Sequence, residues 1–201
     1  MSTAYETTGR VQQKRRTRDA LVAAARELVA QGVAPTVEQA AATAGVSRTT
    51  AYRYFTTQRA LLGAAHPFTA QASLLPENSS DDPRERLDLV LRTLISSNIE
   101  LEAQQRTMLR LSLEASPEER AALPLRQGRA IGWIEEALAP LRERMSAKEV
   151  RQLVLAIRAT TGIESLVWLT DVAGLSRKQA AELMLNSGRA LLEHALATKT
   201  K

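Results

Sequence analysis

The sequence predicts an all-α protein of about nine helices. Apolar residues recur at the three- and four-residue spacing of a helix, and no stretch alternates between apolar and polar residues as a half-buried strand would. Helix starts are marked by capping boxes, in which a Ser, Thr or Asp side chain accepts the backbone N–H three residues ahead and a Glu or Gln there reaches back. The candidate boxes are Thr36/Gln39, Asp82/Glu85, Ser116/Glu119, Ser146/Glu149 and Ser176/Gln179.

The chain divides at a polar, Pro-bounded connection, LLPENSSDDP, residues 74–83. Caps and breaks then set the expected helices. They lie at about 17–31, 36–43, 47–54 and 57–65 before the connection, and at about 83–103, 105–115, 125–139, 146–171 and 176–197 after it. We therefore predict two domains, residues 10–70 and residues 80–199.

Composition excludes several kinds of site. The chain has no Cys, which excludes disulfides, thiolate metal sites and a Cys nucleophile. Its two His residues lack metal-ligand spacing, and no Gly-rich phosphate loop is present. No apolar run reaches the length of a membrane span, and the N-terminus lacks the pattern of a signal peptide. We therefore expect a soluble, cytoplasmic protein that is not an enzyme, needs no metal or cofactor and has no membrane partner.

The positive charge is concentrated at one end of the chain. The net charge is +5, and residues 1–70 contain nine Lys or Arg against four acidic residues, so they carry all of the excess. This asymmetry favours a domain that faces a polyanion, attached to a neutral body. Cationic residues that merely solvate a small domain would produce the same count.

Residues 36–55, TVEQAAATAGVSRTTAYRYF, read as a helix, a tight turn and a second helix. Thr36 can cap the first helix, Gly45 can adopt the positive φ that ends it, and Ser47 can cap the second. Small Ala residues in the first helix allow the second to cross closely. This is the pattern of a helix-turn-helix, whose second helix enters the major groove of DNA by its N-terminal end.

Helical geometry sorts the side chains of the second helix. Arg48, Thr49, Tyr52 and Arg53 share one face, whereas Phe55 turns towards the apolar stripe of the first helix. Arg at a helix start can reach guanine O6 and N7, and Thr can reach bases or phosphates. Tyr hydroxyls suit phosphate oxygens. The sequence therefore predicts base contacts from Arg48 and Thr49, with Tyr52 and the flanking Tyr54 at phosphates.

This stretch and its flanks resemble the tetracycline-repressor (TetR) family of bacterial regulators. The residues that carry the resemblance are Thr17-Arg18, Leu21, Ala25, Leu28, Gly32, Thr36, Val37, Ala41, Ala44-Gly45-Val46-Ser47, Thr50, Tyr52, Tyr54-Phe55 and Ala60-Leu61-Leu62. The resemblance implies an N-terminal helix-turn-helix DNA-binding domain and a C-terminal helical domain that dimerises and binds an effector. The expected DNA-contacting residues are Lys14, Arg15, Thr17, Thr36, Ser47, Arg48, Thr49, Thr50, Tyr52, Arg53, Tyr54, Gln58 and Arg59.

The sequence departs from the family pattern at three places. The family usually has a Lys at the start of the fourth helix for a phosphate contact, and here Gln58 and then Arg59 follow. Ala40 and Ala51 stand where larger aliphatic residues are common, which suggests a leaner core. A basic arm, residues 14–16, precedes the first expected helix; it could reach the minor groove or phosphates, or it could be a solvated tail.

The resemblance also implies a homodimer whose last two helices pair with their copies. The expected interface residues are Leu153, Ile157, Thr161, Ala181, Met184, Gly188, Leu191, Leu192 and Ala195. The same stripes could instead form a core within one chain. The expected effector-pocket residues are Met108, Trp133, Glu164 and Trp168. Alternatively, both Trp residues are core and Glu164 pairs with an Arg such as Arg126, Arg129 or Arg158.

Together these observations predict a sequence-specific transcriptional regulator. We expect a homodimeric repressor that binds a palindromic operator in double-stranded DNA and is released by a small-molecule effector whose identity the sequence does not reveal. The alternative is an effector-free or architectural DNA-binding protein.

Overall fold

All regular structure in the described residues is helical, as predicted. The computed structural model describes residues 4–65, 71–114, 116–118 and 128–198. The chain forms two compact units. The first contains the described residues of 1–70 and 107–126, and the second those of 71–106 and 127–201.

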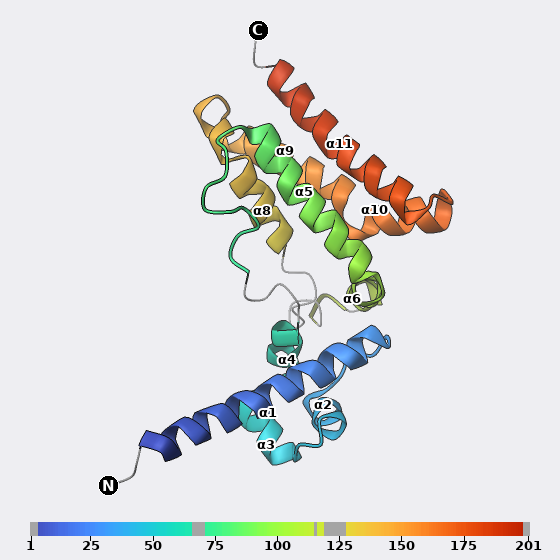
Figure 1. The fold of residues 1–201 in the computed structure, drawn as a ribbon. Coiled ribbons are helices and arrows are strands. Elements are labelled where there is room, and N and C mark those ends of the chain that lie inside the picture. Colours follow the sequence, from blue (N-terminus) through green and yellow to red (C-terminus); the bar gives the residue numbers. More distant parts are fainter. Residues whose placement is uncertain (1–3, 66–70, 115, 119–127, 199–201) are drawn as a thin grey trace. The chain divides into compact units, whose positions relative to one another are not determined.

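The N-terminal unit is built on one long helix, α1 (Ala4–Ala30), which contacts α2 (Val37–Thr43) and α4 (Gln58–Ala65) (Figure 1). The helix between these two, α3 (Arg48–Tyr54), packs on α2. One apolar cluster joins all four helices. Its buried residues are Leu21, Val22, Ala25, Val37, Ala40, Ala41, Ala51, Phe55, Leu61 and Ala65. Ala40 and Ala51 are fully buried in it, so their small size sets how closely α2 and α3 approach.

The first helix begins much earlier than expected. It starts at Ala4 rather than near residue 17, so the predicted basic arm, residues 14–16, lies inside α1. Gln, Lys and Arg have high helix propensity and no Pro interrupts the segment, which explains the extension. An ion pair one turn apart, Arg15 Nε to Asp19 Oδ2 at 3.7 Å, adds a small contribution because both side chains are exposed.

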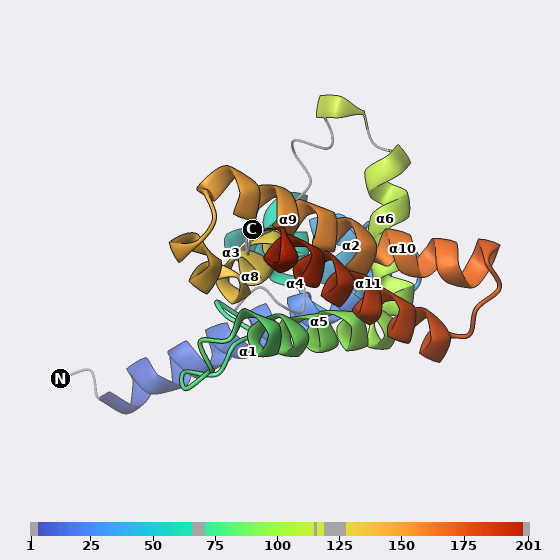
Figure 2. The ribbon, with the colours of Figure 1, turned by 90° about the horizontal axis from the view of Figure 1, so that it is seen from above.

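The C-terminal unit packs three long helices together. They are α5 (Pro83–Glu100), α9 (Ala147–Thr161) and α11 (Arg177–Ala197), with α11 packed on both α5 and α9 (Figure 2). Two shorter helices, α8 (Arg129–Ala137) and α10 (Ile163–Val167), complete the bundle. A 3₁₀ turn, Ala139–Glu143, follows α8, and a π-helical turn, Trp168–Val172, follows α10.

The predicted caps fared differently. Thr36, Ser146 and Ser176 form complete capping boxes. Asp82 caps α5 but accepts from the N–H of Arg84 instead of that of Glu85. The Ser116/Glu119 box includes a residue outside the described part of the chain. The expected helix at 146–171 is broken at Gly162, whose extended backbone separates α9 from α10.

Helix α6 (Glu102–Glu114) starts earlier than the helix expected at 105–115. Its first turns belong to the C-terminal unit and the rest to the N-terminal unit. In the N-terminal unit Met108 packs in a small cluster with Val29 and Leu62. Arg110 donates to the carbonyl of Gly32, in the turn after α1, at 2.6 Å.

Most of the predicted dimer stripe is buried within the single chain. The buried members are Leu153, Ile157, Thr161, Met184, Gly188 and Leu192. A Cβ on Gly188 would lie 2.5 Å from Leu91 on α5, so the small residue allows α11 to approach a helix of its own chain. The burial of these six residues in the core of one chain favours the alternative that the stripes pack within the chain. Ala181, Leu191 and Ala195 are only partly buried.

One described segment, residues 147–172, is long and apolar enough to resemble a membrane span, with a mean hydropathy of 1.3 in its most apolar window. Nearly half of that window is buried inside the C-terminal unit, and the helix is interrupted at Gly162. Both features are those of a core helix.

Candidate DNA-binding site

The turn between α2 and α3 has the geometry that the sequence predicts. Gly45 has a φ of +65°, and no atom lies near the position of a Cβ there, so the backbone conformation rather than space requires Gly. Ser47 then begins α3, because its hydroxyl accepts the N–H of Thr50 at 3.3 Å. The Ser47 hydroxyl also donates to Thr50 Oγ1 at 2.9 Å. These bonds fix the direction in which α3 leaves the turn.

The outer face of α3 is exposed in the first and last turns of the helix. Arg48, Thr49 and Arg53 are exposed, and the other side of the helix buries Ala51 and Phe55. A guanidinium also stacks over the Phe55 ring, since Arg18 Cζ lies 5.5 Å from its centroid. The helix therefore presents cationic and hydroxyl groups outwards, which is the chemistry that binds base edges and phosphates.

A carboxylate from α2 reaches this face. Tyr52 donates its hydroxyl proton to Glu38 Oε1 at 2.6 Å, and Arg48 NH2 lies 3.1 Å from the same oxygen. The hydrogen bond from Tyr52 is the main cause of a lowered pKa at Glu38, and the same bond raises the pKa of Tyr52. Arg48 Cζ lies 5.8 Å from the Tyr52 ring centroid. Three side chains from α2 and α3 thus form one cluster.

The two tyrosines lie closer to the core than the sequence analysis assumed. Tyr52 and Tyr54 are half-buried and pack against the apolar cluster of this unit. The Tyr52 hydroxyl is already a donor to Glu38, so its predicted role at a phosphate would require that bond to break. Thr36 and Thr50 are engaged in the caps of α2 and α3; Thr36 is exposed and Thr50 is partly buried.

Gln58 turns inwards. Its amide nitrogen donates to the carbonyls of Ala34 and Pro35, at 3.0 and 3.2 Å, and so ties the start of α4 to the loop before α2. Arg59, the next residue, is exposed. The geometry therefore favours Arg59 over Gln58 as the side chain that replaces the Lys of the family pattern.

The remaining predicted contacts lie on α1. Lys14 and Arg15 are exposed on consecutive positions of the helix. The Thr17 hydroxyl donates to the carbonyl of Gln13 at 3.0 Å, inside the helix, and does not cap it. The long helix therefore holds these cations on a rigid element instead of a flexible arm.

Comparison with known proteins bears on this unit. Residues 20–65 match the family model described as bacterial regulatory proteins, tetR family. Residues 20–65 form a TetR-family DNA-binding domain. The match runs from α1 to the end of α4 and so contains the whole helix-turn-helix. The chain is therefore a DNA-binding transcription regulator. The search of curated proteins found no match to the chain.

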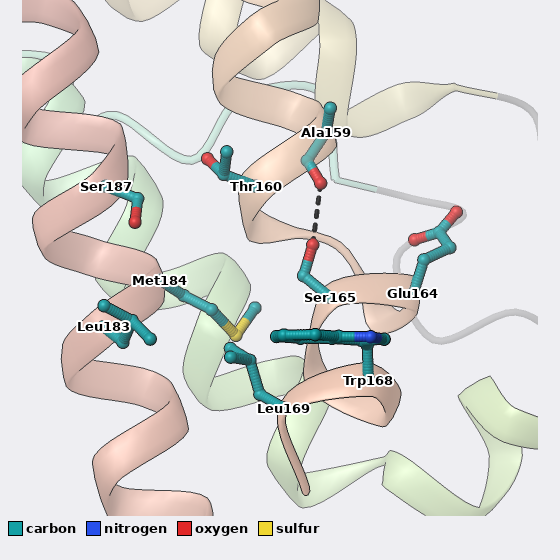
Figure 3. Close-up of a pocket in the computed structure, with 9 residues that line it drawn as sticks. All are labelled: Ala159, Thr160, Glu164, Ser165, Trp168, Leu169, Leu183, Met184 and Ser187. Atoms are coloured by element: carbon teal, nitrogen blue, oxygen red, sulfur yellow. Dashed lines mark hydrogen bonds between the residues drawn. The ribbon is translucent and has the colours of Figure 1, made fainter. Parts of the chain in front are cut away.

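Only two of the four predicted effector-pocket residues come together in the structure. Glu164 and Trp168 line a groove of about 390 Å³ between α9, α10 and α11 (Figure 3). Trp133 is buried on α8, where its indole N–H donates to the carbonyl of Ala72 at 3.1 Å. Met108 is buried in the N-terminal unit. Both side chains are buried, and neither lines this groove.

Glu164 has the partner that the alternative interpretation anticipated. Arg158 NH1 donates to Glu164 Oε2 at 3.4 Å, from the last turn of α9 to the first turn of α10. In Figure 3 its carboxylate points away from Leu183 and Met184, which line the opposite wall, so apolar side chains dominate the groove.

No set of three or more His, Asp or Glu side chains is placed to bind a metal ion within the described ranges of the chain. The sequence analysis did not single out Glu38, which lies at the centre of the cluster on α2 and α3. Its only local signal is an acidic residue two positions after the cap residue Thr36. Glu38 is 14 positions from Tyr52, and only the crossing of α2 and α3 brings the two side chains together.

Proposed function

We propose that this TetR-family regulator is a homodimeric, cytoplasmic repressor that binds a roughly palindromic operator and is released by a small-molecule effector. The observation that carries the proposal is the outer face of α3, where Arg48 and Thr49 are exposed beside the Ser47 cap and Arg53 is exposed in the last turn. Arg48 reads a guanine in each half-site, and Thr49 contacts a neighbouring base or phosphate. Lys14, Arg15, Arg53 and Arg59 contribute phosphate contacts.

The dimer in this proposal forms through the outward face of α9, α10 and α11. Its large exposed apolar residues are Leu155, Trp168, Val172 and Leu183. Trp168 and Leu183 border the groove, and 58% of Trp168 is exposed. An exposed apolar patch of this kind marks an interaction surface, and Trp is enriched at the centre of such surfaces. Because the groove is open and apolar, it suits a second copy of the chain better than a small polar molecule.

The operator prediction is tested by selecting bound sequences from random double-stranded DNA. A two-fold symmetric dimer presents two α3 helices to successive major grooves, so the selected site should contain two inverted half-sites about one helical turn apart. Arg48→Ala should cost about 1 to 3 kcal/mol at one base pair of each half-site. A single asymmetric site, or equal losses of Arg48→Ala on selected and random DNA, would contradict the proposal.

The dimer surface is tested by light scattering of Trp168→Ala and Leu183→Ser. Both variants should shift the mass towards that of one chain, because each removes apolar area from the proposed interface. Leu89→Ser is the matched control, since Leu89 is a partly exposed apolar residue on α5 outside the groove. If Trp168→Ala remains a dimer, the groove is not the interface, and the effector becomes its proposed occupant.

Effector response separates the repressor from an effector-free or architectural protein. A ligand that prefers a conformation with misplaced α3 helices lowers operator affinity by its differential binding energy. The measurement is release from the selected operator across a broad set of metabolites. Release by one chemical class supports the repressor, and the absence of any release favours the effector-free alternative.

A further inference from the structure

The cluster of Glu38, Tyr52 and Arg48 lies on the surface that the proposed function turns towards DNA. A carboxylate there is unexpected, since it repels phosphates and weakens the electrostatic attraction that drives DNA binding. Glu38 is half-buried, and one of its oxygens faces both the Tyr52 hydroxyl and the Arg48 guanidinium. Its charge is therefore balanced locally by a cation and a strong hydrogen-bond donor.

We propose that Glu38 is a positioning residue that sets the base preference of the protein by holding the Arg48 guanidinium in the orientation that reads DNA. Tyr52 takes part in the same arrangement. Its hydroxyl fixes the carboxylate from one side, and its ring lies beneath the guanidinium. The inference rests on the proposed base contact of Arg48 and deepens it, because the selectivity of one Arg becomes a property of three side chains.

The exposure of Arg48 favours orientation over sequestration. Glu38 contacts Arg48 through one terminal nitrogen, and 73% of the Arg48 side chain remains exposed. A guanidinium has five N–H donors in a rigid fork, so one carboxylate oxygen can hold one edge while another edge remains open for guanine O6 and N7. A long side chain fixed at two points also loses less rotamer freedom when it binds a base.

The role of Tyr52 changes accordingly. A hydroxyl that contacts a phosphate contributes to binding of every sequence, whereas one that supports Arg48 contributes to the choice of sequence. Tyr52→Phe keeps the ring that packs on the core and removes only the hydrogen bond to Glu38. We therefore expect this variant to reduce base preference instead of weakening all sequences equally.

The experiment measures affinities of the full chain for the selected operator and for its variants at each base pair. Arg48→Ala identifies the base pair that Arg48 reads. Glu38→Gln and Tyr52→Phe should reduce the preference at that same base pair by about 3- to 30-fold, which lies within the range of interaction energies between residues in contact. In the Arg48→Ala background, Glu38→Gln should reduce it no further. Each preference is a ratio measured on one protein, so a loss of folding stability cancels.

Glu27→Gln is the matched control. Glu27 is an exposed acid on α1 of the same unit, 11 positions before Glu38 in the sequence, and it pairs only loosely with Gln31 at 3.4 Å. Removing its charge should leave every base preference unchanged.

Three results would overturn the inference. The first is an unchanged preference in Glu38→Gln with tighter binding to all sequences, which would make Glu38 only a repulsive charge. The second is a change at a different base pair, which would make Glu38 a direct reader. The third is an equal further loss in the Arg48→Ala background. If Arg48→Ala changes the preference at no base pair, the proposed base contact itself fails. That result is distinct from the other three.

Discussion

At the scale of single residues, neighbours in the sequence have opposite roles. Gln58 and Arg59 are consecutive, yet the Gln58 amide closes the loop before α2, while Arg59 is exposed. The same division separates Phe55, which is buried, from Arg53. Successive residues of a helix are rotated by about 100°, so one of two neighbours can face the core while the other faces outwards. The chemistry of the DNA-binding face therefore depends on the register of each helix.

Gln58 and Arg59 give the first prediction. Gln58→Ala removes two hydrogen bonds to partly buried carbonyls and should lower the free energy of unfolding by about 1 kcal/mol, with little effect on the affinity of the folded protein for DNA. Arg59→Gln should leave stability nearly unchanged and lower the slope of log affinity against log salt by about 0.9, the value for one phosphate contact. Denaturant unfolding and salt titrations measure the two effects. A lower affinity in Gln58→Ala at equal folded fraction would show that Gln58 contacts DNA after all.

Some features of the site are local and follow from the sequence, whereas others depend on how helices pack. The Ser47 cap and the positive φ of Gly45 are local properties, and both were predicted correctly. The outward direction of Arg48 follows from helix geometry alone. The pairing of Glu38 with Tyr52 depends on how two helices cross, and no local pattern encodes that crossing.

At the scale of helices, an apolar stripe specifies burial but not the partner that buries it. The stripes on α9 and α11 have the same periodicity whether they pack on α5 or on another copy of the chain. In the structure the residues Ile157, Met184 and Leu192 are buried within the chain. The sequence therefore predicted both helices and their apolar faces, but it assigned those faces to a dimer. Only the packed bundle reveals that different apolar residues, Leu155, Trp168 and Leu183, remain exposed.

Two glycines in helix interiors give the second prediction. Gly132 on α8 is exposed, and no atom lies within 4 Å of where its Cβ would be. Gly132→Ala should therefore raise the free energy of unfolding by about 0.8 to 1 kcal/mol through helix propensity. Gly188→Ala gains the same propensity, but its Cβ would meet the fully buried Leu91 at 2.5 Å, and such overpacking costs about 1 to 3 kcal/mol.

We therefore expect opposite shifts of the melting temperature, upwards for Gly132→Ala and downwards for Gly188→Ala. The melting temperature of Gly188→Ala should depend on protein concentration no more than that of the unsubstituted chain does, because the contact lies within one chain. A Gly188→Ala variant that melts normally but dissociates more readily would place Gly188 at the dimer interface, as the sequence analysis assumed.

At the scale of the whole molecule, charge is divided between the two units in different ways. The first 70 residues carry the net positive charge, and many of their cationic side chains are exposed. In the C-terminal unit, by contrast, many Arg residues pair with acidic residues. One network surrounds Glu102, which is almost fully buried and accepts from Arg106 Nε at 2.7 Å and from Arg177 Nε at 2.5 Å. Arg106 also forms a two-bond pair with Asp171, at 2.6 and 2.7 Å. This network joins α6, the π-helical turn and α11.

The network predicts a specific dependence of stability on pH. Hydrogen bonds from Arg106 lower the pKa of Asp171 to about 2. Burial raises the pKa of Glu102, but the bonds from Arg177 and Arg106 outweigh it, so this pKa is also lowered. A group whose pKa is lower in the folded state stabilises it fully above the unfolded pKa, 3.8 for Asp171 and 4.5 for Glu102. That stability is lost as the pH falls through the folded pKa.

The melting temperature of the C-terminal unit should therefore fall steeply between about pH 4.5 and pH 2. Asp171→Asn should lower stability at pH 7 and flatten this fall, because the substituted side chain has no proton to gain. The control is Asp81→Asn, which changes an exposed acid in the connection before α5 and should leave the pH profile unchanged. Thermal unfolding followed by circular dichroism at half-unit pH steps makes the comparison. If Asp171→Asn and Asp81→Asn have the same profile, the pairing with Arg106 does not stabilise the folded unit, and its Arg residues would be open to other partners.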